Sequence, residues 1–218
     1  MSNIVPSALE NFFSQFRKIT YKKGETILRA GDPPAGIYLL EKGYVRLYSL
    51  SAEGKELTLL IYQAGDVFPA ALVLAGGGPS LYYSEALTPV ELKRADKKQF
   101  IDFAYQNTAV FRIVSQQVND RFRFALRRME YLAFGDAYAK VASMILICAE
   151  KFGQKEGNKV VIQLPLTHQD IASLAGVTRE TTSLELSKLE KKGLISFQKH
   201  LPAVNNLADL AKESLSEY

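Results

Sequence analysis

Between Phe111 and Leu132, apolar residues recur at steps of three and four, and this feature most constrains how the chain can fold. No glycine occurs in the 37 residues after Lys97, so nothing in this stretch interrupts a helix. The spacing predicts one long helix with a single narrow apolar face, which carries Phe111, Val114, Val118, Phe122, Ala125, Met129 and Leu132.

This apolar face can be buried in two ways. It can pair with the same face of a second copy, as in a coiled-coil seam, or it can pack only on the rest of its own chain. Because the face is narrow and regular, we favour the first alternative and expect a homodimer that forms through residues 110–132. The same helix carries a basic cluster, made of Arg121, Arg123, Arg127 and Arg128.

The pattern from Tyr21 to Asp96 is different. Short apolar or alternating runs are separated by glycines, and Gly43, Gly54 and Gly65 recur at intervals of eleven. Such spacing is typical of an antiparallel β-sandwich or barrel rather than of alternating strands and helices. The expected strands are residues 26–28, 37–40, 44–50, 57–62, 81–87 and 90–95.

The long helix is expected to end at Gly135. This glycine can take a positive φ at the helix end, and Asp136 can cap the helix that follows. We then expect a helix over residues 138–152, a polar turn over 154–158 and a strand over 160–164. Three parts result, with bounds 1–106, 107–135 and 136–218.

The segment that begins at Thr167 has the pattern of two helices joined by a tight turn. Thr167 and Asp170 have the spacing of a reciprocal helix cap. Ala172 lets two helices cross closely, and Gly176 suits a short turn because it lacks a Cβ. Thr178 is placed to cap the second helix. These features predict a helix-turn-helix.

The second of these helices has an apolar inner face and a polar outer one. Leu186 and Leu189 face inward together with Val177, and a β-hairpin wing is expected to end near Val204. An ordinary pair of packed helices would also explain the small residues, but the polar tip suits base edges in a DNA major groove. The candidate DNA-contacting residues are Thr167, His168, Gln169, Thr178, Arg179, Glu180, Thr181, Ser183 and Lys188.

Taken together, the sequence resembles the family of the cyclic-AMP receptor protein and FNR, which are bacterial transcription regulators. The resemblance spans nearly the whole chain, and its most specific segment is Gly176-Val177-Thr178-Arg179-Glu180-Thr181. Further matches are Lys23-Gly24-Glu25-Thr26-Ile27, Ala30-Gly31-Asp32, Glu53-Gly54-Lys55-Glu56, Gly65-Asp66-Val67-Phe68 and Leu132-Ala133-Phe134.

The resemblance implies an α+β fold in three parts. An N-terminal antiparallel β-roll, of the cyclic-nucleotide-binding jelly-roll type, serves as effector or sensor domain over residues 1–106. A dimerisation helix and hinge follow over 107–135, and a C-terminal winged helix-turn-helix binds DNA over 136–218. The implied partners are a palindromic double-stranded operator and RNA polymerase, and the resemblance does not separate activator from repressor.

The nucleotide cassette of the family is altered here. In members that bind cyclic nucleotides, Gly-Asp-x-Phe continues into Gly-Glu, and an Arg-Ser/Thr-Ala run soon afterwards binds the phosphate. Here Phe68 continues into Pro69-Ala70-Ala71, and no Arg or Lys occurs between Lys55 and Lys93. Such members also carry a Thr-Ser pair in the long helix that contacts the base, and the corresponding positions here hold Ala125 and Leu126. We therefore expect no physiological binding of cyclic AMP.

Two alternatives remain for the effector region. It forms a pocket for an apolar or aromatic ligand, with Arg121 or Arg123 available for a carboxylate, or it is a filled core and the protein is regulated by abundance. The candidate effector-binding residues are Phe68, Tyr82, Tyr83, Arg121, Phe122 and Ala125.

The recognition helix also departs from the family pattern. Family members commonly carry an arginine after the residue that matches Ser183, and this arginine reads guanine; here the position holds Leu184. We expect a related twofold-symmetric operator that differs at the positions such an arginine reads. The alternative is a ligand-binding or protein-interaction module that has lost specific operator binding.

Composition argues against several other classes. A single cysteine, Cys148, does not supply a disulfide, a cysteine-based zinc site or an iron–sulfur cluster, and it is expected to be a buried structural thiol. Both histidines, His168 and His200, lie in the DNA-binding part, so we expect no cofactor, no metal and no catalytic site. The N-terminus lacks a signal-peptide pattern and no apolar run approaches the ~18 residues of a membrane span, which predicts a soluble cytoplasmic protein.

The net charge is +4, a weak indication of an anionic partner. The whole excess lies in residues 1–135, since residues 136–218 carry ten basic and ten acidic side chains. Affinity for DNA must therefore come from the local placement of basic residues and from dimerisation, and nonspecific binding should be modest.

Overall fold

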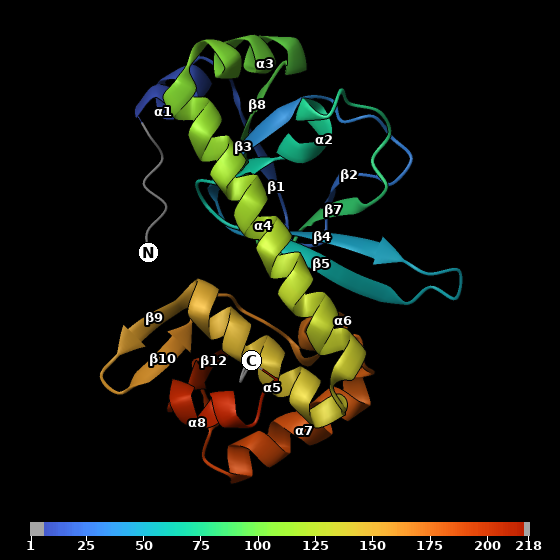
Figure 1. Cartoon of the computed structure of the whole chain (residues 1–218), viewed down its shortest axis with the longest axis vertical. Coiled ribbons are helices and arrows are strands. Elements are labelled where there is room, and N and C mark those ends of the chain that lie inside the picture. The colour runs from blue at the N-terminus through green and yellow to red at the C-terminus, as the bar shows by residue number, and fades with distance from the viewer. Residues whose placement is uncertain (1–6, 216–218) are drawn as a thin grey trace. The chain divides into compact units, whose positions relative to one another are not determined.

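The computed structural model describes residues 7–215, which form two compact units that are divided between Ala125 and Leu126 (Figure 1). This division falls inside the long helix. The boundaries that we expected at residues 106 and 135 mark changes of secondary structure and remain predictions.

The first unit is built on two antiparallel sheets of four strands, with strand orders β1-β8-β3-β6 and β2-β7-β4-β5. The expected β architecture is thus confirmed. Its strands are β1 (Lys18–Tyr21), β2 (Thr26–Leu28), β3 (Ile37–Lys42), β4 (Val45–Leu50), β5 (Glu56–Tyr62), β6 (Val67–Phe68), β7 (Tyr83–Ala86) and β8 (Val90–Ala95). Its helices are α1 (Ser7–Ser14), α2 (Ala70–Leu74), α3 (Lys97–Gln106) and the first part of α4 (Thr108–Phe134).

Strand β3 separates the two cores of this unit. Its alternate residues Ile37 and Leu39 pack with buried residues of α1, α3 and α4. Tyr38 and Leu40 point to the opposite face, where they pack with residues of the second sheet. The period of two along the strand therefore places one sheet between the helices and the other sheet.

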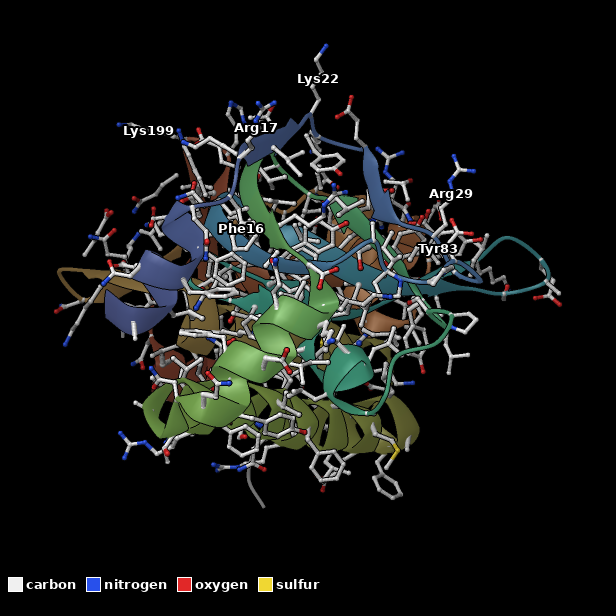
Figure 2. All side chains as sticks on the ribbon, turned by 90° about the horizontal axis from the view of Figure 1, so that it is seen from above. Phe16, Arg17, Lys22, Arg29, Tyr83 and Lys199 are labelled. Atoms are coloured by element: carbon white, nitrogen blue, oxygen red, sulfur yellow. The ribbon has the colours of Figure 1, made fainter. Side chains whose placement is uncertain are left out.

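Helix α1 is joined to this core by an aromatic cluster that the sequence patterns did not predict. The rings of Phe12 and Phe103 stack with centroids 4.2 Å apart, and Phe13 is fully buried. Phe16, just after α1, packs against the same cluster (Figure 2). Burial of these rings stabilises a helix ahead of the first expected strand by packing it against the core.

The second unit has a mixed architecture. Its helices are α5 (Ala137–Phe152), α6 (His168–Ala175), α7 (Arg179–Lys191) and α8 (Leu207–Lys212), together with the last turns of α4. Its sheet has the strand order β11-β12-β10-β9, with β9 (Gly153–Glu156), β10 (Lys159–Ile162), β11 (Ile195–Gln198) and β12 (Leu201–Val204). The predicted wing, which ends at Val204, is confirmed.

Helix α5 lies at the centre of this unit, with every residue from Val141 to Ala149 buried. Asp136 caps it as expected, since its Oδ1 accepts a hydrogen bond from the Ala139 amide at 2.8 Å. Cys148 is 3% exposed, and burial raises the pKa of its thiol to about 12, which agrees with a structural role.

Three expectations are corrected by the structure. Residues 154–158 were expected to form a polar turn, but β9 pairs with β10 from Gly153 opposite Ile162 to Glu156 opposite Lys159. All β9 side chains are exposed, so apolar patterning gave no signal; backbone pairing and the turn at Gly157, with φ of 60°, produce the strand.

Gly135 is the second correction, because it does not adopt the expected positive φ. A Cβ at this position would lie 2.7 Å from the Leu215 side chain and 3.1 Å from the Tyr131 carbonyl oxygen. Glycine is therefore needed here for close packing rather than for a left-handed helix end.

The third correction concerns the apolar face of α4. Val114 is fully buried with Val110 in the core of the first unit, so it does not belong to the outer stripe. If Ser115 takes the place of Val114 in the list of stripe residues, the stripe has the regular spacing of a heptad repeat. Large apolar side chains on this outer stripe are exposed in the single chain, at 39% for Phe111, 60% for Phe122 and 64% for Met129.

Candidate nucleic-acid interface and cavity

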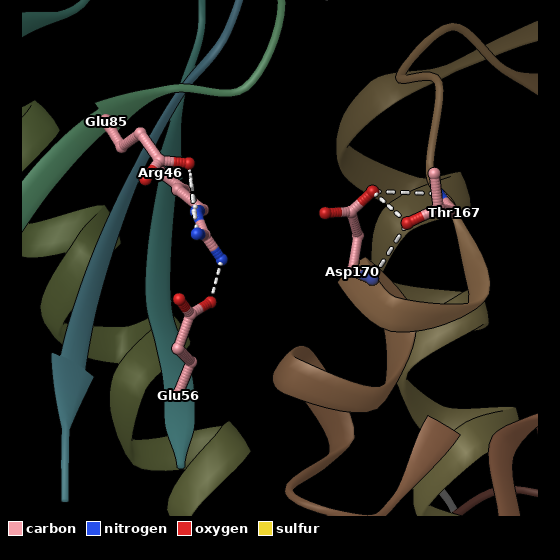
Figure 3. Close-up of polar contacts among 5 residues, drawn as sticks. All are labelled: Arg46, Glu56, Glu85, Thr167 and Asp170. Carbon is pink, nitrogen blue, oxygen red and sulfur yellow. Dashed lines mark hydrogen bonds and ion pairs between the residues drawn. The ribbon is translucent and has the colours of Figure 1, made fainter. Parts of the chain in front are cut away.

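The start of helix α6 is fixed by a reciprocal cap (Figure 3). The Thr167 Oγ1 accepts a hydrogen bond from the Asp170 amide at 3.2 Å, and Asp170 Oδ2 accepts one from the Thr167 amide at 2.8 Å. Two backbone donors that the helix itself leaves without partners are thus satisfied. The predicted capping pair is present.

The turn between α6 and α7 has the predicted geometry. Gly176 has φ of 65°, in the left-handed region, and its amide bonds the Ala172 carbonyl. Ala172 is 1% exposed, which agrees with its place at a helix crossing. Thr178 then caps α7 through a bond from the Thr181 amide to its Oγ1 at 3.1 Å.

Helix α7 is divided into an inner and an outer face. Thr182, Leu186 and Leu189 are buried. On the outer face, Arg179, Glu180, Ser187 and Lys188 are exposed, and Leu184 is exposed at 64%. An exposed polar face at the start of a capped helix is the arrangement that reads base edges in a major groove.

Two of the candidate contact residues bond each other. His168 Nδ1 lies 2.8 Å from Ser183 Oγ, and this hydroxyl also donates to the Arg179 carbonyl at 3.0 Å. The contact joins the first turn of α6 to the middle of α7. Thr167, Gln169 and Thr178 are exposed beside it, so the structure brings the candidate residues of both helices to one region.

Lys188 is paired in a way that the sequence patterns did not predict. Its Nζ lies 2.8 Å from the Glu185 carboxylate, which is mostly buried on α7. The separation of three residues on a helix could have indicated this pair. Because Glu185 neutralises Lys188, this lysine offers less net charge to a phosphate than its exposure suggests.

The wing is closed by a tight turn. Lys199 and His200 adopt positive φ values of 49° and 70° between β11 and β12. Such a pair of angles matches the twist of an antiparallel hairpin. Lys199 is exposed at the tip of this turn (Figure 2).

The basic cluster of the long helix is only partly a surface feature. Arg123 is exposed, whereas Arg128 is 3% exposed and donates two hydrogen bonds to the Leu174 carbonyl. The Arg121 side chain is also only 12% exposed, so the fold buries part of this cluster.

The first unit contains an apolar cavity of about 390 Å³. Most of its wall is aliphatic or aromatic, and its polar side chains are few. It is lined by Leu47, Leu60, Tyr62, Pro69, Ala70, Ala71, Leu72, Ser80, Leu81, Tyr82, Val118, Arg121, Phe122 and Ala125. A cavity of this volume is of the size that binds small organic molecules.

Arg121 is the basic side chain of this wall, and it is already engaged. Its guanidinium lies 3.1 Å from Asp66 Oδ1 and donates to the Val67 carbonyl at 3.1 Å. The Cζ atom of Arg121 also lies 4.9 Å from the centroid of the Tyr62 ring. A ligand carboxylate would therefore have to compete with an ion pair that the fold supplies.

The six candidate effector residues divide into two groups. Tyr82, Arg121, Phe122 and Ala125 line the cavity. Phe68 does not; it is 1% exposed and stacks on Tyr62 with centroids 4.8 Å apart. The lining residues that we did not anticipate come from β4, β5, α2, α4 and the loops before α2 and β7. An alternating strand pattern shows burial but not which side chains border a void.

Tyr83 also lies outside the cavity wall. Its ring stacks on Tyr48 with centroids 5.2 Å apart, beside a half-buried ion triad. In this triad Arg46 lies 2.6 Å from Glu56 and 3.0 Å from Glu85 (Figure 3). The triad joins three strands of one sheet, which indicates a structural role for this neighbourhood.

Among the described residues, no helix has the length and apolar character to cross a membrane. Comparison with protein families finds two matches. A family described as "Cyclic nucleotide-binding domain" matches residues 18–107, and one described as "Crp-like helix-turn-helix domain" matches residues 139–213.

Relatives and solved structures agree with these matches. The "Global nitrogen regulator" of Nostoc sp. is 30% identical, over 89% of this chain and 87% of its own. The "CRP-like cAMP-activated global transcriptional regulator" of Mycobacterium tuberculosis is 24% identical, over 97% and 94%. These relatives are transcription regulators rather than enzymes.

Two solved structures show the same architecture. FixK2 from Bradyrhizobium japonicum has a TM-score of 0.80 at 23% identity, with 93% of this chain and 99% of that chain covered. A transcriptional regulator of the CRP/FNR family from Thermus thermophilus has a TM-score of 0.70 at 26% identity, with 93% and 99% covered.

Proposed function

The chain belongs to the Crp/Fnr family of transcription regulators, and from this premise we propose that it binds a twofold-symmetric DNA operator as a homodimer. The observation that carries the DNA-binding proposal is the capped helix pair α6 and α7, joined at Gly176, with an exposed polar face that begins at Arg179. We further propose that it acts in the cytoplasm and, as a regulator, meets RNA polymerase at its promoters.

The proposal of a dimer is supported by the outer stripe of α4. In the single chain, Phe111, Phe122 and Met129 on this stripe are 39–64% exposed. Apolar side chains of this size are rarely left in water along a heptad face, and a second copy of the same helix would cover them. The dimer would then place two α7 helices for two operator half-sites.

For the effector, we propose a small, uncharged apolar or aromatic molecule rather than cyclic AMP. The cavity wall includes Pro69, Ala70 and Ala71, and Arg121 is held by Asp66. A cyclic phosphate would therefore enter an apolar cavity without a ready cationic partner. The cavity itself favours a ligand pocket over a filled core.

Selection of duplexes from a random pool tests the DNA-binding proposal. We expect a twofold-symmetric site that differs from the family half-site where an arginine at position 184 would read guanine. Anisotropy titrations with the selected duplex should then show a loss of affinity and specificity for Arg179→Ala. Failure to enrich any site would instead support a module without operator binding.

Calorimetry tests the effector proposal separately. Titration with cyclic AMP should give no heat at micromolar concentrations. Micromolar binding would overturn the argument from the cavity wall, whatever the outcome of the DNA selection.

A further inference from the structure

Arg128 makes an unusual contact with the helix-turn-helix. Its Nε and Nη2 donate to the same backbone oxygen, the carbonyl of Leu174, at 3.1 and 2.6 Å. Leu174 lies in the last turn of α6, two residues before Gly176. The end of the long helix is thus bonded directly to the turn that leads into α7.

The contact is electrostatically favourable at this place. The last carbonyl groups of an α-helix have no partner within the helix, and the C-terminal end carries partial negative charge. A guanidinium that bonds one of these carbonyls satisfies both features. Few other side chains offer two donors in one plane to a single acceptor.

Burial shows that this contact is more than a surface decoration. Arg128 is only 3% exposed, and burial lowers its pKa to about 10, so the side chain is still charged at neutral pH. Burying a charge is expensive unless it is well bonded, and an aliphatic residue would pack here at lower cost. The position therefore holds an arginine for its bonds.

The neighbouring residue makes a second connection. Arg127 Nη1 donates to Glu150 Oε2 on α5 at 2.8 Å, and its Nε bonds the hydroxyl of Tyr131 at 2.6 Å. Tyr131 is itself 2% exposed. Two consecutive residues of α4 thus hold α5 and α6, the two helices that precede the recognition helix.

We propose that Arg128 is a positioning residue for DNA binding, because it fixes the helix-turn-helix turn to the last turns of α4 and so sets the direction of α7 relative to those turns. The inference rests on the proposed function, in which α4 pairs two copies. The distance between the two α7 helices then depends on how rigidly each is joined to α4.

A rigid connection has a measurable consequence. After one half-site is bound, the second binding event is intramolecular, and its strength depends on how well the second α7 is already placed. Loosening the connection should weaken binding to an operator with two half-sites. It should leave binding to an isolated half-site nearly unchanged, since that event uses one α7 only.

The test uses the full-length protein and the duplex recovered from the random pool. Arg128→Met keeps the volume and removes the donors, and Arg123→Met, at an exposed position of the same helix, is the matched control for loss of a charge. Anisotropy is measured with duplexes that carry two half-sites, one half-site, or two half-sites separated by one extra base pair.

We expect Arg128→Met to bind the two-half-site duplex about tenfold more weakly and the single half-site within about twofold of the native protein. The extra base pair between the half-sites should also reduce the affinity of Arg128→Met by a smaller factor than it reduces that of the native protein. Arg123→Met should follow the native protein on all three duplexes. Equal losses on the single and double half-sites, or no loss on either, would overturn the proposal.

Thermal unfolding shows whether Arg128→Met folds, and a second variant covers the case in which it does not. In that case Arg128→Lys, which keeps the charge but cannot donate two bonds in one plane, takes its place with the same expected pattern. If the native protein binds no duplex, the proposed function fails, which is distinct from a native protein that binds and a variant that binds equally well.

Discussion

Asp66 Oδ1 lies 3.1 Å from Arg121 Nη2 in the first unit, where both side chains are largely buried. Asp66 also accepts a hydrogen bond from the Gln63 amide at 2.8 Å, and Gln117 bonds both Arg121 and the Gly65 carbonyl. The pair therefore joins α4 to the loop before β6. Because Asp66 neutralises Arg121, this guanidinium is not available to an anionic ligand.

Asp66→Asn should destabilise the protein by about 3 kcal/mol, because it leaves the Arg121 charge buried without its carboxylate. Chemical denaturation measures the free energy of unfolding. Asp102→Asn, at an exposed position of α3, is the control and should change it by less than about 0.5 kcal/mol. Equal effects of the two substitutions would contradict a structural role for the pair.

The cavity should prefer a neutral aromatic probe over its carboxylate counterpart. In calorimetry we expect heat on titration with 1-naphthol and none with 1-naphthoate at the same concentration, since Arg121 is held by Asp66. Leu72→Trp, which adds a ring to the cavity wall, should abolish the 1-naphthol signal. Tighter binding of 1-naphthoate to the native protein would show that Arg121 is available to anions.

Much of the fold could be predicted because its signals are local. The glycine-separated runs predicted β3, β4, β5 and β8. The caps at Thr167 and Thr178 predicted where α6 and α7 begin. Helix α1 and strand β9 were missed because tertiary packing of Phe13 and backbone pairing of an exposed strand decide them.

The candidate sites show the same limit. Sequence order indicated which residues of α6 and α7 gather on one face, since helix spacing is regular. It did not indicate that Phe68 fills the core, that Arg128 is buried, or that Glu185 pairs with Lys188. These facts depend on which face of each element meets the rest of the fold.

Leu184→Arg should change sequence preference rather than general affinity. Leu184 is 64% exposed on the outer face of α7, so a longer side chain can extend from it without repacking the core. An arginine there can donate two bonds to a guanine, worth roughly 1–3 kcal/mol of discrimination. Repeating the random-pool selection with the variant should enrich guanine at one position of each half-site; Leu184→Ala should not.

Thr167→Ala should weaken binding to all DNA sequences alike. The substitution removes the cap that Thr167 Oγ1 provides for the Asp170 amide, with a loss of about 1 kcal/mol in stability. Thr167→Ser keeps the hydroxyl and should retain both stability and affinity. Anisotropy with selected and scrambled duplexes checks the result, and a loss confined to the selected duplex would show that Thr167 reads bases.

Phe122→Glu should convert the protein to a monomer. Phe122 is 60% exposed in the single chain and occupies the outer stripe of α4, where a partner helix would enclose it. A carboxylate at that position would be buried beside its own symmetry mate, and like charges in an apolar seam are strongly unfavourable. Light scattering after size exclusion measures the mass. Asp120→Lys, at an exposed position outside the heptad stripe, is the matched control and should remain a dimer. A dimer in both variants would place the interface elsewhere on the chain.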